Sequence, residues 1–419
     1  MPQLFSRDFG LLVAGQVVSI IGSAVIRFAL DLYVLDLTGR ADVFAAVVAL
    51  SALPGIVFTP IGGAIADRYS KRNLMVGLDA TSGGLILGLF ALMGAGLAPV
   101  PVIGVFLAAL AVIASVYQPT VQASVPVLVA QERLASANGL VTGIGALAYL
   151  LGPVLGGVAY GFFGIGPLLI AGGCAFGASA GMEVFIRLPR AGARGGGRIV
   201  PALLGDVRDG VAYVARRDRV IWRVGALAAT LNLFMSPVFG IGVPYVLRFT
   251  MRSSDAMYGI GLGICELASI VGAVTAGAAT KRLRLGGVWR LIALAGLAYA
   301  PMALAVTPAM LGRGYWPSFG LFFASAVVAL SICTMTSVYV VTEVQKRTPA
   351  AMMGKVMALL LTASQIAAPL GQILYGLAFE GFSQRAWLPV LGACAFTLAI
   401  AAAARVFLRP AAGAGPAGG

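Results

Sequence analysis

The chain has 419 residues, of which 60% are hydrophobic and 11% are charged, and its formal net charge is +14. Soluble domains carry about 25% charged residues, so this composition excludes a soluble globular protein. The chain contains no histidine, which excludes histidine metal sites, histidine proton relays and serine–histidine nucleophiles.

Apolar residues come in long runs separated by short polar segments, which is the pattern of a polytopic helical membrane protein. The predicted spans are residues 11–36, 43–66, 74–95, 101–127, 137–162, 165–187, 221–248, 256–279, 288–307, 317–342, 353–379 and 386–408. The predicted fold class is therefore all-α and integral to the membrane, with twelve transmembrane helices.

One long polar stretch follows the sixth span. It divides the chain into a six-helix bundle at 1–188, a cytoplasmic linker at 189–219, a second six-helix bundle at 220–410 and a flexible tail at 411–419. Within the linker, apolar residues recur at helical spacing among arginines, as at Leu203, Val207 and Val211. This pattern predicts an amphipathic helix on the membrane surface, with a solvated linker helix as the alternative.

The basic residues predict the orientation. With the amino terminus placed in the cytoplasm, 23 of the 29 Lys and Arg residues fall on the cytoplasmic face, as expected for a membrane protein. We therefore predict a multi-pass protein of the cell (inner, cytoplasmic) membrane with both termini in the cytoplasm. The positive charge then reflects topology and contact with membrane lipids, and it does not predict binding to nucleic acid.

Nothing in the sequence indicates a metal, a cofactor or an enzymatic site. The four cysteines lie far apart inside apolar runs and are predicted to be core thiols. Residues 177–181 match the G-x-S-x-G nucleophile pattern around Ser179. Without histidine this serine has no ordinary base, so helix packing is the favoured interpretation. A P-loop is also missing, so transport would not be powered directly by ATP.

The two halves of the sequence repeat each other. The loop Gly63–Arg68 after the second span has a counterpart at Gly277–Arg282 after the eighth, and two further pairs of features recur at offsets of 214–216 residues. Two parallel six-helix repeats imply a central cavity at their interface and alternating access by rocking.

The loop after the second span resembles the loop signature of the major facilitator superfamily, with Gly63, Asp67, Arg68, Lys71 and Arg72 at the signature positions. The resemblance implies a loop that helps to lock the two halves together on the cytoplasmic side. Gly63 would permit close helix approach, and Asp67 would accept hydrogen bonds from a helix amino terminus or an arginine. As the alternative, the basic pair Lys71 and Arg72 only marks the cytoplasmic side.

The fifth span resembles the signature associated with antiporters of this superfamily, through Gly152, Pro153, Gly156 and Gly157. Small residues let helices touch backbone to backbone, and the proline permits a bend. Tight packing without any antiporter-specific role is the alternative.

The linker segment Asp206–Arg216 resembles that of the macrolide-efflux-like exporters, the third drug:proton antiporter group, and Tyr117-Gln118-Pro119 agrees with that group. The resemblance covers nearly the whole chain and implies a proton-coupled exporter of amphipathic small molecules or drugs, expected to act as a monomer. Three alternatives stay open: export or flipping of a lipid-like or siderophore-like metabolite, another coupling ion, and a non-transporting membrane sensor.

Ionisable residues inside the spans are costly and are candidate coupling groups. Glu266, near the middle of the eighth span, is the first candidate because a buried carboxyl keeps its proton until water reaches it. A neutral glutamic acid hydrogen-bonded within the helix packing is the alternative. Asp31 is the second. It lies four residues after Arg27 on one helix face, which predicts a structural ion pair or, alternatively, a pair that takes part in transport. Among the remaining acidic residues, Asp79 is assigned to the gate network and Glu183, Glu343 and Glu380 to snorkelling or capping at span ends.

Several polar or soft residues fall at mid-depth and are candidates for lining a substrate cavity. They are Gln118, Asn232, Met235, Tyr339 and Gln365. Arg27, on the outer half of the first span, is a further candidate that would meet an anionic group of the substrate if it is not held in an ion pair. A largely apolar cavity with a few polar groups and methionines would suit bulky amphipathic ligands. Ordinary helix packing is the alternative for each of them.

Overall fold

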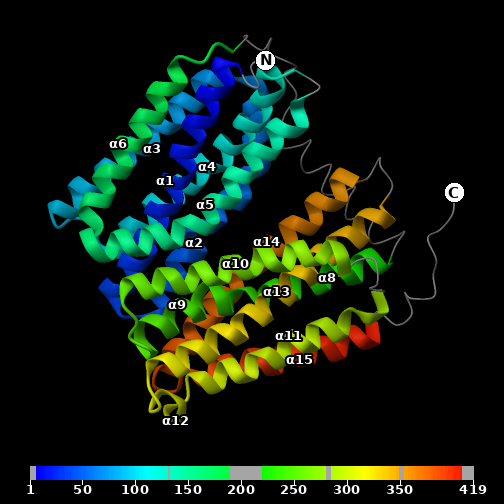
Figure 1. Cartoon of the computed structure of the whole chain (residues 1–419). Coiled ribbons are helices and arrows are strands. Elements are labelled where there is room, and N and C mark those ends of the chain that lie inside the picture. Colours follow the sequence, from blue (N-terminus) through cyan, green and yellow to red (C-terminus); the bar gives the residue numbers. More distant parts are fainter. Residues whose placement is uncertain (1–5, 131–132, 189–218, 280–284, 349–352, 408–419) are drawn as a thin grey trace. The chain divides into compact units, whose positions relative to one another are not determined.

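The computed structural model describes residues 6–130, 133–188, 219–279, 285–348 and 353–407, and its regular elements in these ranges are all helices (Figure 1). The long helices of the N-terminal half are α1 (Arg7–Thr38), α2 (Ala41–Arg68), α3 (Lys71–Gly94), α4 (Val100–Leu128), α5 (Leu134–Phe163) and α6 (Ile165–Val184). Those of the C-terminal half are α8 (Arg219–Phe234), α10 (Asp255–Ala279), α11 (Val288–Ala305), α13 (Tyr315–Arg347), α14 (Met353–Gly381) and α15 (Trp387–Phe407). Short helical turns are η2 (Val238–Gly242), α9 (Val243–Tyr245), η3 (Val246–Thr250), η4 (Leu285–Gly287), α12 (Pro308–Leu311) and η5 (Ser383–Arg385).

The predicted membrane fold is confirmed. Within the described residues, 11 helical stretches are long and apolar enough to cross a membrane, and α14 adds a long helix at the predicted eleventh span. Each predicted span coincides with a long helix to within a few residues, the seventh being α8 continued through η2, α9 and η3. The predicted linker helix lies outside the described residues.

Helix ends follow ordinary capping chemistry. Ser6 accepts a hydrogen bond from the Phe9 amide at 3.2 Å and caps the start of α1. Gly39 ends α1 with a φ of 63°, a left-handed conformation that glycine adopts without strain. Gly164 separates α5 from α6 with a φ of 72° and a ψ of −178°, an extended conformation with positive φ that also favours glycine. These glycines let consecutive long helices reverse direction over a single residue or two.

The chain folds into two compact units. Unit 1 comprises Met1–Gly39 and Leu50–Ala202, and unit 2 comprises Arg40–Ala49 and Leu203–Gly419. The first residues of α2 therefore group with unit 2 rather than with the rest of their helix. In that segment the Ala41 amide donates to the Glu380 carboxylate of α14 at 3.0 Å.

The helix pairings of one unit match those of the other. In unit 1, α1 packs on α5 and α6, and α3 packs on α4 and α6; in unit 2, α8 packs on α14 and α15, and α11 packs on α13 and α15. Glycines sit at equivalent contacts. A Cβ on Gly83 would lie 3.0 Å from the carbonyl oxygen of Gly173, and a Cβ on Gly296 would lie 3.1 Å from Leu398. The internal sequence repeat thus corresponds to a repeat of helix packing.

The seventh span departs from a regular α-helix. After α8 it runs through two π-helical stretches, Val238–Gly242 and Val246–Thr250, on either side of the short helix α9. Pro237 and Pro244 lie in this region and cannot donate their backbone nitrogen to the helical ladder. π-Helical turns occur preferentially at functional sites, and this one adjoins the cavity described next.

Candidate functional site

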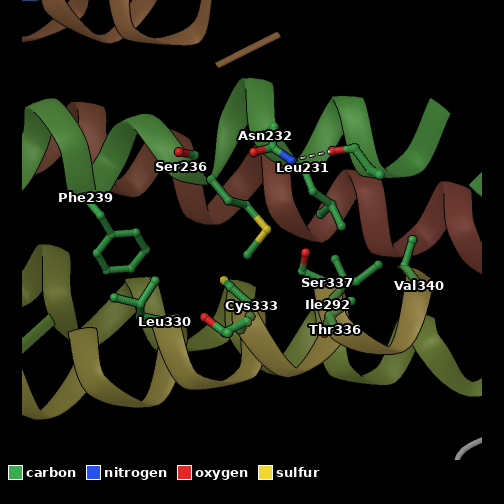
Figure 2. A pocket seen from close by; sticks show the side chains of 14 residues that line it. Leu231, Asn232, Ser236, Phe239, Ile292, Leu330, Cys333, Thr336, Ser337 and Val340 are labelled. Atoms are coloured by element: carbon green, nitrogen blue, oxygen red, sulfur yellow. Dashed lines mark hydrogen bonds between the residues drawn. The ribbon is translucent and has the colours of Figure 1, made fainter. Parts of the chain in front are cut away.

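A cavity of about 240 Å³ lies inside unit 2, between α8, η2, α11 and α13 (Figure 2). Its apolar lining comes from Ala228, Leu231, Met235, Phe239, Ile292, Ala295, Leu330 and Val340. Its polar or soft lining comes from Asn232, Ser236, Cys333, Thr334, Thr336 and Ser337. An apolar cavity with a few convergent polar groups is the usual form of a small-molecule site.

Two of the predicted cavity residues, Asn232 and Met235, line this space. The Asn232 amide nitrogen donates to the Ala228 carbonyl at 3.1 Å, as drawn in Figure 2. That bond fixes the side chain and leaves its amide oxygen able to accept a hydrogen bond from a ligand. Met235 is 5% exposed and offers a flexible apolar contact beside it.

The other two candidates of the C-terminal half do not line this cavity. Tyr339 is buried in a core cluster with Ile292, Val340 and Val356. Gln365 lies exposed on α14. The structure therefore brings Asn232 and Met235 together and leaves Tyr339 and Gln365 apart from them.

A second cavity, of about 120 Å³, lies inside unit 1 and is lined by residues of α1, α3, α4 and α6. The predicted residues Arg27 and Gln118 line it. So do Ser19, Asp79 and Tyr117, which the sequence did not single out as cavity residues.

Asp79 is hydrogen-bonded within a buried polar cluster, whereas the sequence predicted that it pairs in the gate network. It is 2% exposed, and its carboxyl is hydrogen-bonded to the Ser19 hydroxyl of α1. Ser19 Oγ lies 2.8 Å from Ser179 Oγ of α6, and Ser179 in turn donates to the Gly15 carbonyl at 3.0 Å. Ser179 is therefore a buried contact between α1 and α6, in line with the packing interpretation of its G-x-S-x-G pattern.

The assignment of Glu183 to snorkelling or capping was wrong. Its side chain is wholly buried and accepts a hydrogen bond of 2.7 Å from the Tyr117 hydroxyl. Glu183 lies one turn after Ser179 on α6, and a Cβ on Gly15 would be within 3.5 Å of both side chains. The position close to the helix end suggested exposure, but neighbouring helices extend past that end and cover it. Glu343 and Glu380 agree better with the predicted roles at span ends. Glu343 pairs with Arg347 at 2.8 Å, and Glu380 accepts a hydrogen bond from the Ala41 amide at the start of α2.

Arg27 and Asp31 interact electrostatically, but in the described part of the chain they do not make the direct salt bridge that the sequence predicted. Asp31 has one buried carboxylate oxygen without a hydrogen-bond partner there, while Arg27 is exposed and borders the unit 1 cavity. Glu266 is half-buried on α10. The next helix positions, Leu267, Ile270 and Val271, are exposed apolar side chains.

The loop signature residues lie at the junction of α2 and α3. Gly63 was expected to allow close helix approach, but a Cβ there would meet no described atom within 4 Å. The close approach is made by Gly62, where a Cβ would lie 3.0 Å from Val116 Cα on α4. Adjacent helix residues point about 100° apart, so only one of the two can face α4. Lys71 and Arg72 begin α3 half-buried and Arg68 is exposed, while the side chain of Asp67 lies outside the described part.

The glycines of the fifth span do hold α5 against α1. A Cβ on Gly152 would lie 2.7 Å from Ala24 Cβ, and one on Gly156 would lie 2.8 Å from a ring carbon of Phe28. Pro153 lies within the helix between them, and Gly157 is buried.

Many apolar helices in two matching sets, with internal cavities and buried carboxyl groups, are typical of polytopic transporters. Comparison with known proteins agrees. The sequence matches the Major Facilitator Superfamily over residues 12–372. The chain therefore belongs to that superfamily and is a transporter, with the family's helical membrane fold.

Curated relatives include efflux proteins. The chain is 24% identical to macrolide efflux protein A of Streptococcus pyogenes over 394 residues, covering 92% of this chain and 93% of that protein. It is 24% identical to the multidrug efflux pump Tap of Mycobacterium bovis, covering 87% and 85%. Among solved structures, the nucleoside transporter NupG aligns with a TM-score of 0.75 at 13% identity, covering 96% of this chain and all of that one. A bacterial homologue of the iron transporter ferroportin aligns with a TM-score of 0.67 at 17% identity, covering 94% and 98%.

Proposed function

We propose that this protein exports amphipathic small molecules, drugs included, in exchange for protons, by alternating access. The observation that carries the proposal is the unit 2 cavity, whose apolar wall is interrupted by the amide of Asn232 and by hydroxyl groups. Its volume of about 240 Å³ lies just below the usual range for drug-sized ligands. It therefore suits one apolar portion of a larger amphipathic molecule. The efflux relatives support the direction of transport.

The proposed orientation follows from the basic residues, with both termini in the cytoplasm and the protein acting as a monomer in the inner membrane. Under this proposal Asp67, Arg68, Lys71 and Arg72 belong to a cytoplasmic gate. Asp67→Asn is then expected to slow turnover while leaving substrate affinity unchanged. Equal turnover in the variant and the wild type would contradict the gate assignment.

Asp31 and Glu266 are the proposed proton carriers. Each is a carboxyl group within a membrane span, and Asp31 has a buried oxygen without a partner among the described residues. An ionised carboxyl in such a place is expensive, so protonation and deprotonation there accompany changes in water access.

The test is transport in proteoliposomes with an imposed pH gradient, using radiolabelled erythromycin as a macrolide probe and ethidium as a cationic amphipathic probe. Uphill movement of either probe that stops when an ionophore collapses the proton gradient is the expected result. Protein-free liposomes serve as the control. Transport that is insensitive to the proton gradient but follows a sodium gradient would overturn the coupling assignment.

Export of a lipid-like metabolite is the second candidate, because the cavity wall is mostly apolar. A fluorescent phospholipid assay in the same vesicles separates the two. Movement of the lipid without movement of either probe would favour this second function.

A further inference from the structure

Five buried polar side chains of unit 1 are linked by hydrogen bonds and form what we call the acidic cluster: Ser19, Asp79, Tyr117, Ser179 and Glu183. Four helices, α1, α3, α4 and α6, each contribute to it. All five side chains are less than 5% exposed. Hydrogen-bonded members of the cluster lie up to 160 positions apart in the sequence, so only the folded half brings them together.

The serine contacts of the cluster need more hydrogens than the serines themselves supply. The Gly15 carbonyl oxygen can only accept a hydrogen bond, so the Ser179 hydroxyl, 3.0 Å away, donates its one hydrogen to it. Ser179 must then accept from Ser19, 2.8 Å away. Ser19 Oγ also donates to Asp79 Oδ2 when that carboxyl group is ionised, and its single hydrogen cannot serve both contacts. All three contacts are hydrogen bonds only when Asp79 is protonated.

Buried polar atoms without a hydrogen-bond partner in the described part of the chain lie in and beside the cluster. One carboxyl oxygen of Glu183 is buried and has no hydrogen-bond partner among the described residues. Neither polar atom of the Gln16 side chain has one either, although Gln16 is wholly buried and adjoins Gly15 on α1. Buried polar groups are nearly always paired. Acceptors left over beside two carboxyl groups provide places for a proton to reside and to move.

The two carboxyl groups of the cluster have no cationic partner within the described residues. The ionisable residues of the contributing helices, and of α5 packed against α1, are Arg7, Asp8, Arg27, Asp31, Tyr33 and Asp36 on α1; Lys71, Arg72 and Asp79 on α3; Tyr117 on α4; Tyr149 and Tyr160 on α5; and Cys174 and Glu183 on α6. Within the described residues, the hydrogen bonds to Asp79 and Glu183 come from hydroxyl groups, and no ion pair neutralises either one. Two buried carboxylates that share a site cannot both ionise cheaply.

The unit 1 cavity gives protons access to the cluster. Asp79, Ser19 and Tyr117 line the cavity of about 120 Å³, together with Arg27 and Gln118. A cavity of that size accommodates water. Asp79 is thus hydrogen-bonded to the cluster and in contact with a space through which a proton can arrive or leave.

From this geometry we propose that the acidic cluster is a further proton-binding site, in which Asp79 takes up the proton and Glu183 with Tyr117 forms its second half. Ionisation of Asp79 leaves one hydrogen too few, so one of the bonds along Asp79–Ser19–Ser179–Gly15 breaks. Protonation therefore adds one hydrogen bond to the contacts that α1 makes with α3 and α6. Its role in transport rests on the proposed function, because it makes the cluster a coupling site besides Asp31 and Glu266.

Infrared difference spectroscopy tests the site without any substrate. Purified wild-type protein in detergent is titrated with base while the carbonyl band of protonated carboxyl groups is followed. We expect Asp79→Asn or Glu183→Gln to remove the intensity of one such group, and the control Glu343→Gln to leave the band unchanged, because Glu343 is paired with Arg347. Asp79→Asn is expected to fold, since its amide supplies the hydrogen that the protonated carboxyl gives to Ser19. A titrating band that is the same in the wild type, Asp79→Asn and Glu183→Gln would overturn the proposal.

Vesicle transport tests the role in coupling. Proton and substrate binding affect each other reciprocally, typically by about 5- to 150-fold. In an antiporter the substrate should bind more tightly as the pH rises. Asp79→Asn is expected to abolish that pH dependence and uphill transport, while substrate counterflow without a gradient continues. Retention of both pH dependence and uphill transport would overturn the coupling role. Wild-type protein without any proton-driven transport would instead contradict the proposed function, and the infrared result would still decide on the site.

Discussion

Tyr117 donates a hydrogen bond of 2.7 Å to Glu183, a residue 66 positions later in the chain and on a different helix. Both side chains are less than 5% exposed, so the bond compensates in part for removing a carboxyl group from water. It also fixes α4 to α6 at the end of the six-helix half where the acidic cluster lies. The stability of that half therefore depends on a polar contact inside an otherwise apolar packing.

Replacing Tyr117 by Phe is expected to destabilise the protein. The change leaves both carboxyl oxygens of Glu183 without a partner among the described residues, and an unpaired buried polar group costs about 1–3 kcal/mol. Thermal unfolding of the purified protein in detergent, followed by intrinsic fluorescence, measures the shift. Tyr160→Phe is the matched control, because the Tyr160 hydroxyl donates at 3.2 Å to Asp36, which is half-buried and not wholly buried. An equal or larger loss in the control would contradict the importance assigned to the Tyr117–Glu183 bond.

Glycine substitutions in α5 should divide according to whether they face α1. Gly152→Ala and Gly156→Ala add a methyl group where Ala24 and Phe28 leave no room, and overpacking of this kind costs about 1–3 kcal/mol. Gly145→Ala is the control on the same helix, since no described atom lies within 4 Å of its added Cβ. Alanine is there expected to be neutral or to stabilise the helix by up to about 1 kcal/mol. Thermal unfolding that is insensitive to all three changes would mean that α1 and α5 are not held by this contact.

Asn232→Leu is expected to weaken substrate binding while the protein stays folded. The leucine keeps the volume of the side chain but removes the amide oxygen that can accept a hydrogen bond in the unit 2 cavity. The loss of one such bond corresponds to about 0.5–1.5 kcal/mol of binding free energy. Equilibrium binding of radiolabelled erythromycin gives the affinity directly. Thr230→Val is the control, because Thr230 lies on α8 outside the lining of this cavity and bonds the Ala226 carbonyl of its own helix. Unchanged affinity in Asn232→Leu would remove Asn232 from the site.

Glu266→Gln and Asp31→Asn are expected to reduce uphill transport driven by a pH gradient, since each removes a titrating carboxyl group from a span. Exchange of labelled for unlabelled substrate at equal concentrations needs no net proton movement, so it should continue. Glu343→Gln is the control, because that carboxylate is held by Arg347 at 2.8 Å. Normal pH-driven transport in both variants would exclude these residues as proton carriers.

The architecture could be predicted from the sequence because its signals are long and repeated. Each span has some 20 or more apolar residues, so errors at single positions do not change the assignment, and the twelve predicted spans all coincide with long helices. The glycines of α5 were also predicted as close contacts. Individual glycines were less secure, because a one-residue change on a helix turns the side chain by about 100°. The close approach to α4 was accordingly assigned to Gly63 instead of Gly62.

The acidic cluster could not be derived in the same way. Glu183 lies near the end of α6, where exposure to lipid head groups or water is the usual expectation, and the sequence says nothing of the helices that cover it. One signal was available. Because successive spans run in opposite directions, Ser19, Asp79 and Ser179 fall towards the same end of the first six helices, and polar side chains at a common depth on three helices can meet. The missing direct salt bridge between Arg27 and Asp31 has a simpler reason, since spacing places two side chains on one face without fixing which way each one turns.

The π-helical turns after α8 give the two halves different surfaces. A π-turn takes up one residue more than an α-turn does, and every extra residue rotates the positions that follow by about 100° around the helix axis. In the N-terminal half, the counterpart of the seventh span is α1, which runs as a continuous α-helix from Arg7 to Thr38. Equivalent sequence positions of the two helices therefore point in different directions beyond Pro237. After duplication of an ancestral six-helix unit, such a change in winding would free the positions beyond Pro237, Phe239 of the unit 2 cavity among them, to differ from their counterparts on α1.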